Sequence, residues 1–495
     1  MVVVPYTWVF KLKTLDAAGT KFLEKSRCCI CGNRQTPELD FDPHTVYAPV
    51  ASHEAVRILL AVAASNDLIV EGGDISNAYL YGDIDVTIYM EQPTDSSCQL
   101  EFPGMVCKLL KSIYGLKQAG HIWGSLLMQS LRQWGFEASA MDPRVLFKNV
   151  GEEFIALVVV VDDLTFASNS PRMIHAFKAK LAETFDVKLF GRMSTFLGWE
   201  TSFSQQGIKI SQARYTQELL DRHGMKHCNG TLTPMGKDVD LRPRLPSESP
   251  LSLQDHAKYR RMVGELLYLA VCTRPDISFA VSSLARSLHA PTRRHFSMIN
   301  RVLRYLSTTK SHGILYPAGN GEQLDLRAFC DADWAGDLEK RHSTTGFFIE
   351  VNGAPVAWKS VRQSIIALST AEAEYIALST TGKEISWIRR LFAEIKDHKR
   401  ICGDVPLLCT PIFTDSTAAL SIAEKDSINA RTKHIDVRFH HIRLLRMNDV
   451  ISFAHVPSAR NRADFLTKPL ERAIYQPLRD EIVKEVRNSD INSDN

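Results

Sequence analysis

The chain has 495 residues, a length that fits about three structural units, each large enough to bury a core. Hydrophobic residues make up 45% of it and charged residues 23%, proportions that are ordinary for folded proteins and exclude disorder over most of the chain. The net charge of +3 comes from 59 basic and 56 acidic residues, so charge alone neither indicates nor excludes nucleic-acid binding.

Ten cysteines are scattered along the chain, a pattern that favours a reducing compartment over a disulfide framework. Cys28 and Cys31 have C-x-x-C spacing, but no second pair of ligands follows at the distance of a zinc site. The longest apolar run, Phe154–Val161, is too short to cross a bilayer, and the N-terminus lacks the features of a signal peptide. We therefore expect an intracellular protein that binds neither membrane nor structural zinc.

The first half of the chain alternates short β-type runs with helical stretches from Trp8 to about Met225, which predicts a mixed α/β unit. Its clearest predicted elements are a buried helix at 56–64, a central strand at 155–161 and an amphipathic helix at 175–185. Prolines gather among serines and charges between Thr231 and Ser252, which predicts a linker.

Helical patterns return between Tyr259 and Leu306, with breaks expected before Pro275 and Pro291. A second α/β unit follows. Its predicted elements are a strand ending at residue 330, a long helix at 370–395, a strand-to-helix junction at 413–416 and a strand at 450–456. The last residues are polar, so we expect a flexible tail.

A first group of carboxylates follows apolar strands in the first unit. Asp162 and Asp163 end the apolar run in VVVVDDLTFAS, and Asp74 follows a short strand in EGGDISNAYLYGD. Adjacent carboxylates at a buried strand end repel one another and lose hydration, and a divalent metal relieves both penalties. Three carboxylates suit a pair of Mg²⁺ ions that activates a 3′-hydroxyl and steadies the leaving pyrophosphate. An isolated Asp pair is also common at a plain hairpin turn, so that alternative stays open.

A second group repeats this chemistry on four elements of the second unit. Asp331 ends a strand, Glu374 begins the long helix, Asp415 lies at a strand-to-helix junction, and Asp464 follows the last strand. One carboxylate from each of four elements is what two Mg²⁺ ions need to straddle a scissile phosphate. Taken alone, each residue would fit a surface ion pair better than a catalytic site.

Eight blocks, in order along the chain, resemble the copia-type reverse transcriptases. They are VYAPVASHEAVRILLAVAA, GDISNAYLYGDIDVTIYMEQP, KLLKSIYGLKQAGHIW, VVDD, FLGWE, ISQARYTQELLDRHGM, YRRMVGELLYLAVCTRPDISFAV and VLRYLSTT. The second carboxylate group, together with RTKHIDVRFHHIR, resembles the RNase H domain of the same elements. The resemblance implies an α/β (α+β) right-hand polymerase followed by an RNase H-like domain. The implied regions are fingers and palm at 1–230, a helical thumb and connection with the linker at 231–322, RNase H at 323–470, and a polar flexible tail at 471–495.

The resemblance also implies roles for individual residues. The metal-binding catalytic carboxylates are Asp74, Asp162 and Asp163 for polymerisation, and Asp331, Glu374, Asp415 and Asp464 for RNase H. Glu374 is preferred over Glu372 because the Tyr-Ile-Ala-Leu that follows it matches the family's helix. The nucleotide-binding residues are Lys25 and Arg27 at the triphosphate, Tyr79 as the gate at the sugar 2′ position, and Gln118. A solvated surface strand for Lys25 and Arg27, and a helix-cap role for Gln118, remain alternatives.

The implied function is RNA- and DNA-directed DNA synthesis with RNase H cleavage, using two Mg²⁺ ions, or Mn²⁺, in each site. The implied partners are an RNA template, a DNA primer, the RNA/DNA hybrid, dNTPs and other products of the same polyprotein, in a cytoplasmic particle or the nucleus. Val160, Gly120 and Cys31 replace the family's usual tyrosine, proline and arginine. These departures leave two alternatives open: a remnant that only binds nucleic acid, and a nuclease that has lost polymerisation.

Overall fold

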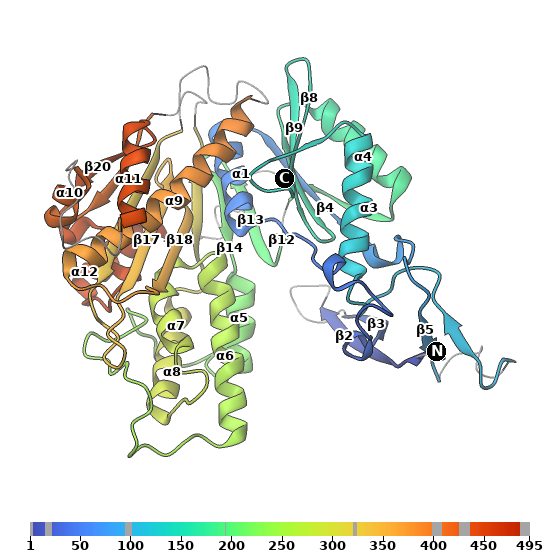
Figure 1. The fold of residues 1–495 in the computed structure, drawn as a ribbon, viewed down its shortest axis with the longest axis horizontal. Helices are drawn as coiled ribbons and strands as arrows, with labels where there is room; N and C mark the ends of the chain where they lie inside the picture. The colour runs from blue at the N-terminus through green and yellow to red at the C-terminus, as the bar shows by residue number, and fades with distance from the viewer. Residues whose placement is uncertain are drawn as a thin grey trace.

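The computed structural model describes residues 3–14, 22–94, 101–193, 195–319, 324–397, 408–424 and 436–485. Figure 1 shows two sheets side by side, with a group of helices below them and a separate set of short strands near the N-terminus. Within the described part, no helix combines the length and the apolar character that crossing a bilayer requires.

The first large sheet has six strands in the order β11-β4-β10-β9-β8-β7. Its strands and covering helices are β4 Ile69–Ile75, β7 Glu137–Ala138, β8 Val145–Val150, β9 Glu153–Val160, β10 Asp163–Ser168, β11 Val187–Arg192, α3 Ala119–Gln133 and α4 Pro171–Thr184. The predicted central strand is confirmed as β9, and the predicted amphipathic helix is α4. This helix begins earlier than expected because Pro171 takes its first position and the Ser170 hydroxyl accepts a hydrogen bond from the Met173 amide.

The N-terminal strands extend from one end of this sheet (Figure 1). They are β1 Val3–Val4, β2 Tyr6–Thr14, β3 Phe22–Ile30, β5 Tyr89–Glu91 and β6 Val106–Lys108. Strands β2 and β3 form an antiparallel pair, and on β2 the side chains of Phe10 and Leu12 are exposed. The two predicted triphosphate contacts, Lys25 and Arg27, lie on β3.

A third sheet, in the order β12-β13-β14-β15-β21, joins distant parts of the chain. The elements of this middle part are β12 Thr195–Phe196, β13 Trp199–Ser204, β14 Gly207–Ser211, β15 His312–Pro317, β21 Lys484–Glu485, α5 Ala213–Arg222, α6 Leu253–Cys272, α7 Ser278–Ala285 and α8 Arg293–Thr308. Both predicted helix breaks are confirmed, since α6 ends before Pro275 and α8 begins after Pro291. Residues 231–252 form neither helix nor strand, as expected of the linker.

The C-terminal sheet has the order β18-β17-β16-β19-β20, with β16 to β18 antiparallel and β19 and β20 parallel to β16. Its elements are β16 Leu326–Asp333, β17 Thr344–Val351, β18 Ala354–Arg362, α9 Thr370–Asp397, β19 Thr410–Thr414, α10 Thr417–Glu424, α11 Asp436–Met447 and β20 Ile451–His455. The first strand runs past Cys330 to Asp333, so the predicted catalytic Asp331 lies inside its last residues.

The expectation of a flexible tail from residue 471 is wrong for its first part. Residues Arg472–Ile482 form helix α12, and β21 pairs with β15. The helix is amphipathic and buries Tyr475, whose hydroxyl donates a hydrogen bond to the Asp276 carbonyl at 2.9 Å. Its apolar face therefore has a partner, which polar composition alone did not reveal. Residues 486–495 lie outside the described part of the chain.

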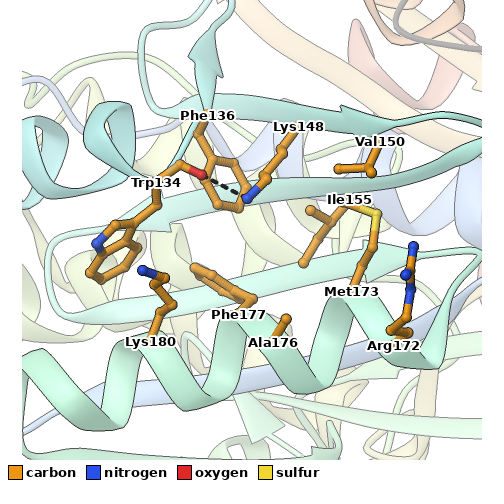
Figure 2. Close-up of a pocket in the computed structure, with 10 residues that line it drawn as sticks. All are labelled: Trp134, Phe136, Lys148, Val150, Ile155, Arg172, Met173, Ala176, Phe177 and Lys180. Atoms are coloured by element: carbon orange, nitrogen blue, oxygen red, sulfur yellow. Dashed lines mark hydrogen bonds between the residues drawn. The ribbon is translucent and has the colours of Figure 1, made fainter.

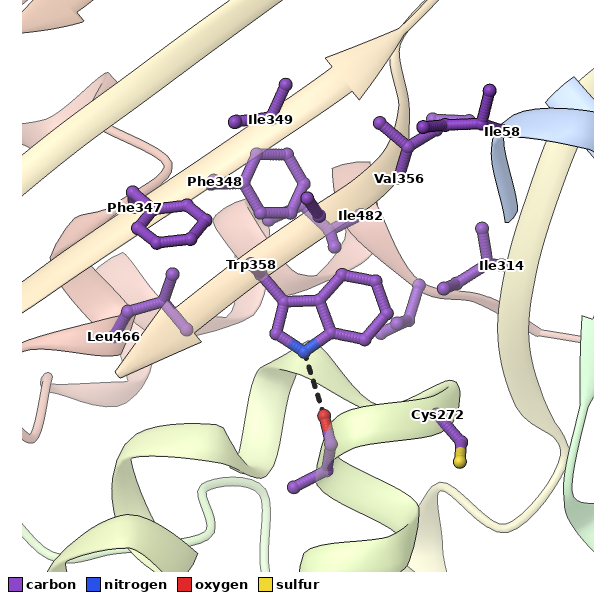
Figure 3. Packing of buried hydrophobic residues seen from close by; sticks show 14 of the residues in the cluster. Ile58, Cys272, Ile314, Phe347, Phe348, Ile349, Val356, Trp358, Leu466 and Ile482 are labelled. Atoms are coloured by element: carbon purple, nitrogen blue, oxygen red, sulfur yellow. Dashed lines mark hydrogen bonds between the residues drawn. The ribbon is translucent and has the colours of Figure 1, made fainter. Parts of the chain in front are cut away.

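Helix α1, His53–Ser65, confirms the predicted buried helix and lies between the large sheets (Figure 1). One continuous core cluster runs through α1, the middle helices and the C-terminal sheet. Figure 3 shows part of it, where the Trp358 indole donates a hydrogen bond to the Ala270 carbonyl at 2.8 Å beside Ile58 and Val356. The predicted regions are therefore packed through a common core.

Candidate catalytic sites

The first carboxylate group is brought together by strand pairing. Asp74 in β4 and Asp163 in β10 are directly opposite residues of neighbouring antiparallel strands. Asp162 lies in the turn between β9 and β10, and its carbonyl accepts a hydrogen bond from the Ile75 amide at 3.0 Å. All three residues are half-buried, so their carboxylates are accessible near the ends of these strands.

The turn that carries Asp162 has an unusual backbone. Val161 has a φ of 58°, which is costly for a β-branched residue. The Trp123 indole donates a hydrogen bond to the Val161 carbonyl at 2.8 Å, and Trp123 itself is buried. Helix α3 therefore holds the strained turn in place and fixes the backbone position of Asp162.

The charges around Asp162 couple the sheet to the N-terminal strands. Burial raises the pKa of Asp162, and the neighbouring Asp74 raises it further. Arg27 and Lys25 oppose this shift, so both cations act on Asp162 from β3. The predicted triphosphate contacts and the predicted carboxylates thus face the same region.

Two tyrosines lie at this region as well. Tyr79 is half-buried, and its ring meets the Tyr114 ring edge-on with centroids 5.0 Å apart. Burial and then Asp162 raise the pKa of Tyr79. The Arg27 guanidinium lies over the Tyr114 ring at 5.0 Å, which makes Tyr114 a support for Arg27 that we did not predict.

Gln118 lies deeper than its predicted role requires. It is fully buried, its Nε2 donates to the Asp40 carbonyl at 2.9 Å, and its Oε1 accepts from Gln35 at 3.1 Å. These contacts tie the start of α3 to the loop at residues 35–40. A direct contact of Gln118 with template or nucleotide stays a prediction.

The second carboxylate group converges more closely. Asp331, Asp415 and Asp464 each offer a ligand atom, and these atoms all lie within 4.8 Å of one another. The reason is topological, because β16 and β19 are adjacent parallel strands whose ends lie together, and Asp464 begins a short helical turn packed on β16 and β17. In the described part of the chain only this trio meets that criterion.

Glu374 joins the trio from α9, which packs on β16. Its carboxylate accepts a hydrogen bond from the Ala332 amide, and burial followed by Asp331 and Asp415 raises its pKa to about 9. The competing Glu372 is used differently, since its Oε2 accepts a hydrogen bond from the Leu368 amide at 2.8 Å. That contact caps the start of the helix and favours Glu374 as the fourth carboxylate.

Two buried oxygens in this group lack a hydrogen-bond partner: Oε2 of Glu374 and Oδ1 of Asp464. Both residues are about one-twentieth exposed, at 5% and 4%. Buried carboxylate oxygens without donors are costly, and the only ligands that several such oxygens share well are cations. This group of carboxylate oxygens therefore fits Mg²⁺ or Mn²⁺, which prefer oxygen ligands.

Three residues around the trio were not predicted. The Thr467 hydroxyl donates to Asp331, the Ser458 hydroxyl donates to Asp415, and the Lys468 ammonium lies 3.1 Å from Asp464 Oδ2. The spacing of Lys468 four residues after Asp464 is a signal that sequence can supply, because such residues are neighbours on a helical turn. The contact of Thr467 with Asp331 has no local signal.

A hollow of about 390 Å³ lies between α4 and the neighbouring strands, lined by apolar side chains such as Phe177 and by the cations Lys148, Arg172 and Lys180 (Figure 2). No predicted catalytic residue lines it. Asp74, Asp163 and Asp331 lie near the ends of central strands of their sheets.

Comparison with known proteins identifies relatives over almost the whole chain. Residues 2–237 match the family described as Reverse transcriptase (RNA-dependent DNA polymerase). The Retrovirus-related Pol polyprotein from transposon TNT 1-94 of Nicotiana tabacum is 35% identical over 477 residues, 95% of this chain and 35% of that protein. A transposon Ty5-1 protein of Saccharomyces cerevisiae is 34% identical over 314 residues, 63% of this chain and 100% of that protein. The match to the solved structure of LC11-RNase H1 in complex with RNA/DNA hybrid includes 29% of this chain and 93% of the RNase H1 chain. The two are 19% identical, with a TM-score of 0.22.

The matched residues 2–237 place the chain in the reverse transcriptase class. The chain belongs to the copia-type family of retrotransposon Pol polyproteins. The predicted family and fold class are thereby confirmed. The chain spans about a third of the longer polyproteins it matches, 35% and 31% of their lengths.

The buried acids predict an inverted pH dependence of stability. The pKa of Glu374 is raised from 4.5 to about 9 and that of Asp464 from 3.8 to about 7. At a pH between the ordinary and the raised pKa of either group, that group holds its proton in the folded chain and has lost it in the unfolded chain. Raising the pH through this window therefore favours unfolding. We expect the melting temperature in EDTA to fall from pH 6 to pH 9, and Mg²⁺ to raise it most at high pH. Thermal denaturation across this range measures it, with Glu374→Gln as the variant that weakens the trend. A melting temperature that rises with pH would contradict it.

Proposed function

We propose that this chain is an RNA- and DNA-directed DNA polymerase that also cleaves the RNA strand of an RNA/DNA hybrid. One observation carries the proposal: a member of the reverse transcriptase family has two separate carboxylate groups, each near the strand ends of its own sheet. DNA synthesis on an RNA template produces a hybrid, and the second group supplies the means to remove its RNA strand. The substrates are then an RNA template, a DNA primer and dNTPs.

In the polymerase site, Asp74, Asp162 and Asp163 hold the metal ions. When bound, two Mg²⁺ ions at each site activate the attacking hydroxyl or water and stabilise the charge that develops on the leaving oxygen. Lys25 and Arg27 neutralise the triphosphate, which their electrostatic effect on Asp162 supports. The half-buried ring of Tyr79 excludes a 2′-hydroxyl.

In the nuclease site, Asp331, Asp415 and Asp464 hold the ions and Glu374 completes the set. Thr467 and Ser458 fix the orientation of two of these carboxylates, because each hydroxyl donates to one of them.

We place fingers and palm at 1–230, thumb and connection at 231–322, and RNase H at 323–470. Action in a cytoplasmic particle or the nucleus, with other products of the same polyprotein, is part of the proposal.

A second candidate function is nuclease activity without polymerisation. The described carboxylates converge within 4.8 Å only at the RNase H site. In the polymerase site, Val160 lies directly opposite Asp163 where the family has a tyrosine. This candidate predicts RNA cleavage by a protein that cannot extend a primer.

The test uses the purified chain with Mg²⁺, dNTPs and a DNA primer annealed to RNA, each strand carrying its own end label. We expect both primer extension and RNA fragments, and loss of both in EDTA. Fragments without extension would establish the nuclease alone. If neither product forms while the hybrid still binds, the proposed function is wrong and the chain only binds nucleic acid.

A further inference from the structure

The nuclease site contains a cation of its own. The Lys468 ammonium lies 3.1 Å from Asp464 Oδ2 and 3.7 Å from Asp331 Oδ2, so it contacts two members of the converged trio. Both carboxylates are almost fully buried, with 2% of Asp331 and 4% of Asp464 exposed. Lys468 is thus positioned among the very oxygens that fit a divalent metal ion.

A lysine and a divalent ion at these oxygens oppose each other. Two positive charges a few ångströms apart repel strongly in a site screened from water. An oxygen that accepts a hydrogen bond from an ammonium also has one lone pair fewer for a metal. The favourable pairing of Lys468 with Asp464 must therefore be lost, or weakened, before a metal ion can occupy the trio.

The Lys468 side chain can move its ammonium group away from the carboxylates. Its side chain is 39% exposed, whereas the side chains of Asp331 and Asp464 are 3% and 5% exposed. A lysine has a long flexible stem, so its ammonium can turn out to solvent while the stem stays packed. The neighbouring Thr467 stays bonded to Asp331 through its own hydroxyl, which holds the segment in place.

We propose that Lys468 is an internal counter-ion of the nuclease site that competes with the divalent metal ion and sets its affinity. The proposal rests on the proposed function only in identifying this trio as the metal site. Lys468 neutralises the buried carboxylates and gives them up when the metal ion binds. A higher free concentration of the metal ion is then needed to fill the site than if the carboxylates had no lysine beside them.

The test measures metal binding, not activity. Mn²⁺ binding to the full chain is followed by calorimetry and by electron paramagnetic resonance for the wild type, Lys468→Met and Lys468→Arg. Asp162→Asn is included in every background so that binding at the polymerase site is reduced. We expect Lys468→Met to bind Mn²⁺ about tenfold more tightly at the nuclease site, as removal of one nearby positive charge implies. Lys468→Arg keeps the charge and is expected to stay close to the wild type.

A matched control removes a lysine from an ion pair on the surface. Lys237 pairs with Glu471, and both side chains are more than half exposed, at 62% and 53%. Lys237→Met changes the net charge equally and is expected to leave Mn²⁺ affinity unchanged. Unchanged or weaker binding in Lys468→Met, with a normal circular dichroism spectrum, would overturn the proposal. If wild-type protein binds Mn²⁺ but cleaves no RNA, the proposed function fails while the Lys468 comparison still stands.

Discussion

Asp162→Asn is expected to reduce DNA synthesis on the order of a thousandfold and to leave RNA cleavage within about twofold of the wild type. Asparagine has nearly the same shape as aspartate but carries no charge, so it retains the packing of the turn and loses a metal ligand. The opposite neighbours Asp74 and Asp163 remain paired across β4 and β10, and the Trp123 contact to Val161 does not involve the Asp162 side chain. The fold is therefore expected to be unchanged.

Asp415→Asn is the matched control, because it makes the same chemical change at the second carboxylate group. It is expected to remove RNA cleavage and to leave primer extension intact. Primer extension and fragment release are measured in the same reaction at saturating Mg²⁺. If Asp162→Asn extends primers at the wild-type rate, then Asp162 has no catalytic role. If each substitution removes both activities, the two sites do not act independently.

Arg57→Met is expected to lower the free energy of unfolding by about 3–5 kcal/mol, the range for breaking a buried charge network. Arg57 is 1% exposed and donates from Nε to the Val356 carbonyl, and from Nη1 to the carbonyls of Val271 and Cys272. It also pairs with Glu54 at 3.0 Å. Helix α1 is thus tied to the C-terminal sheet and to the end of α6 by one side chain.

Methionine fills much of the same volume, so packing loss is not the main cost. The larger cost is that buried carbonyls lose their donors, and each unsatisfied group costs about 1–3 kcal/mol. Relief of the desolvation of the guanidinium offsets part of this, but the carbonyls belong to the backbone and cannot be removed with it. Chemical denaturation measures the change. Arg214→Met, which breaks an exposed pair with Glu218, is the control and is expected to cost less than about 1 kcal/mol. A change below about 1 kcal/mol for Arg57→Met would contradict this account.

Sequence predicted the features that depend on local pattern. The β-branched run before Asp162 predicted β9, and apolar residues at helical spacing predicted α4, because each element buries a face that the pattern marks. The carboxylates were found at strand ends because charges there require a partner. Prolines 275 and 291 placed the helix breaks, since proline restricts the residue before it.

The features that sequence did not predict depend on long-range contacts. Arg57 reads as one more charged residue on a helix, and its partner Val356 is 299 positions away. Helix α12 looked like a polar tail because its partners, Asp276 and Tyr305, come from the middle helices. Gln118 matched a family block, but the block does not tell whether the side chain contacts a ligand or the neighbouring loop.

The sheet that pairs β15 with β21 has a consequence for how the protein is made. His312 pairs with Glu485, and the same sheet contains β13 and β14 from the first half of the chain. The ribosome must therefore release residues near 485 before this sheet can be completed. Contacts between such distant positions slow folding, because the chain must close long loops before any stabilisation is gained. Strand β15 therefore gains its last partner only after residues 484–485 have been synthesised.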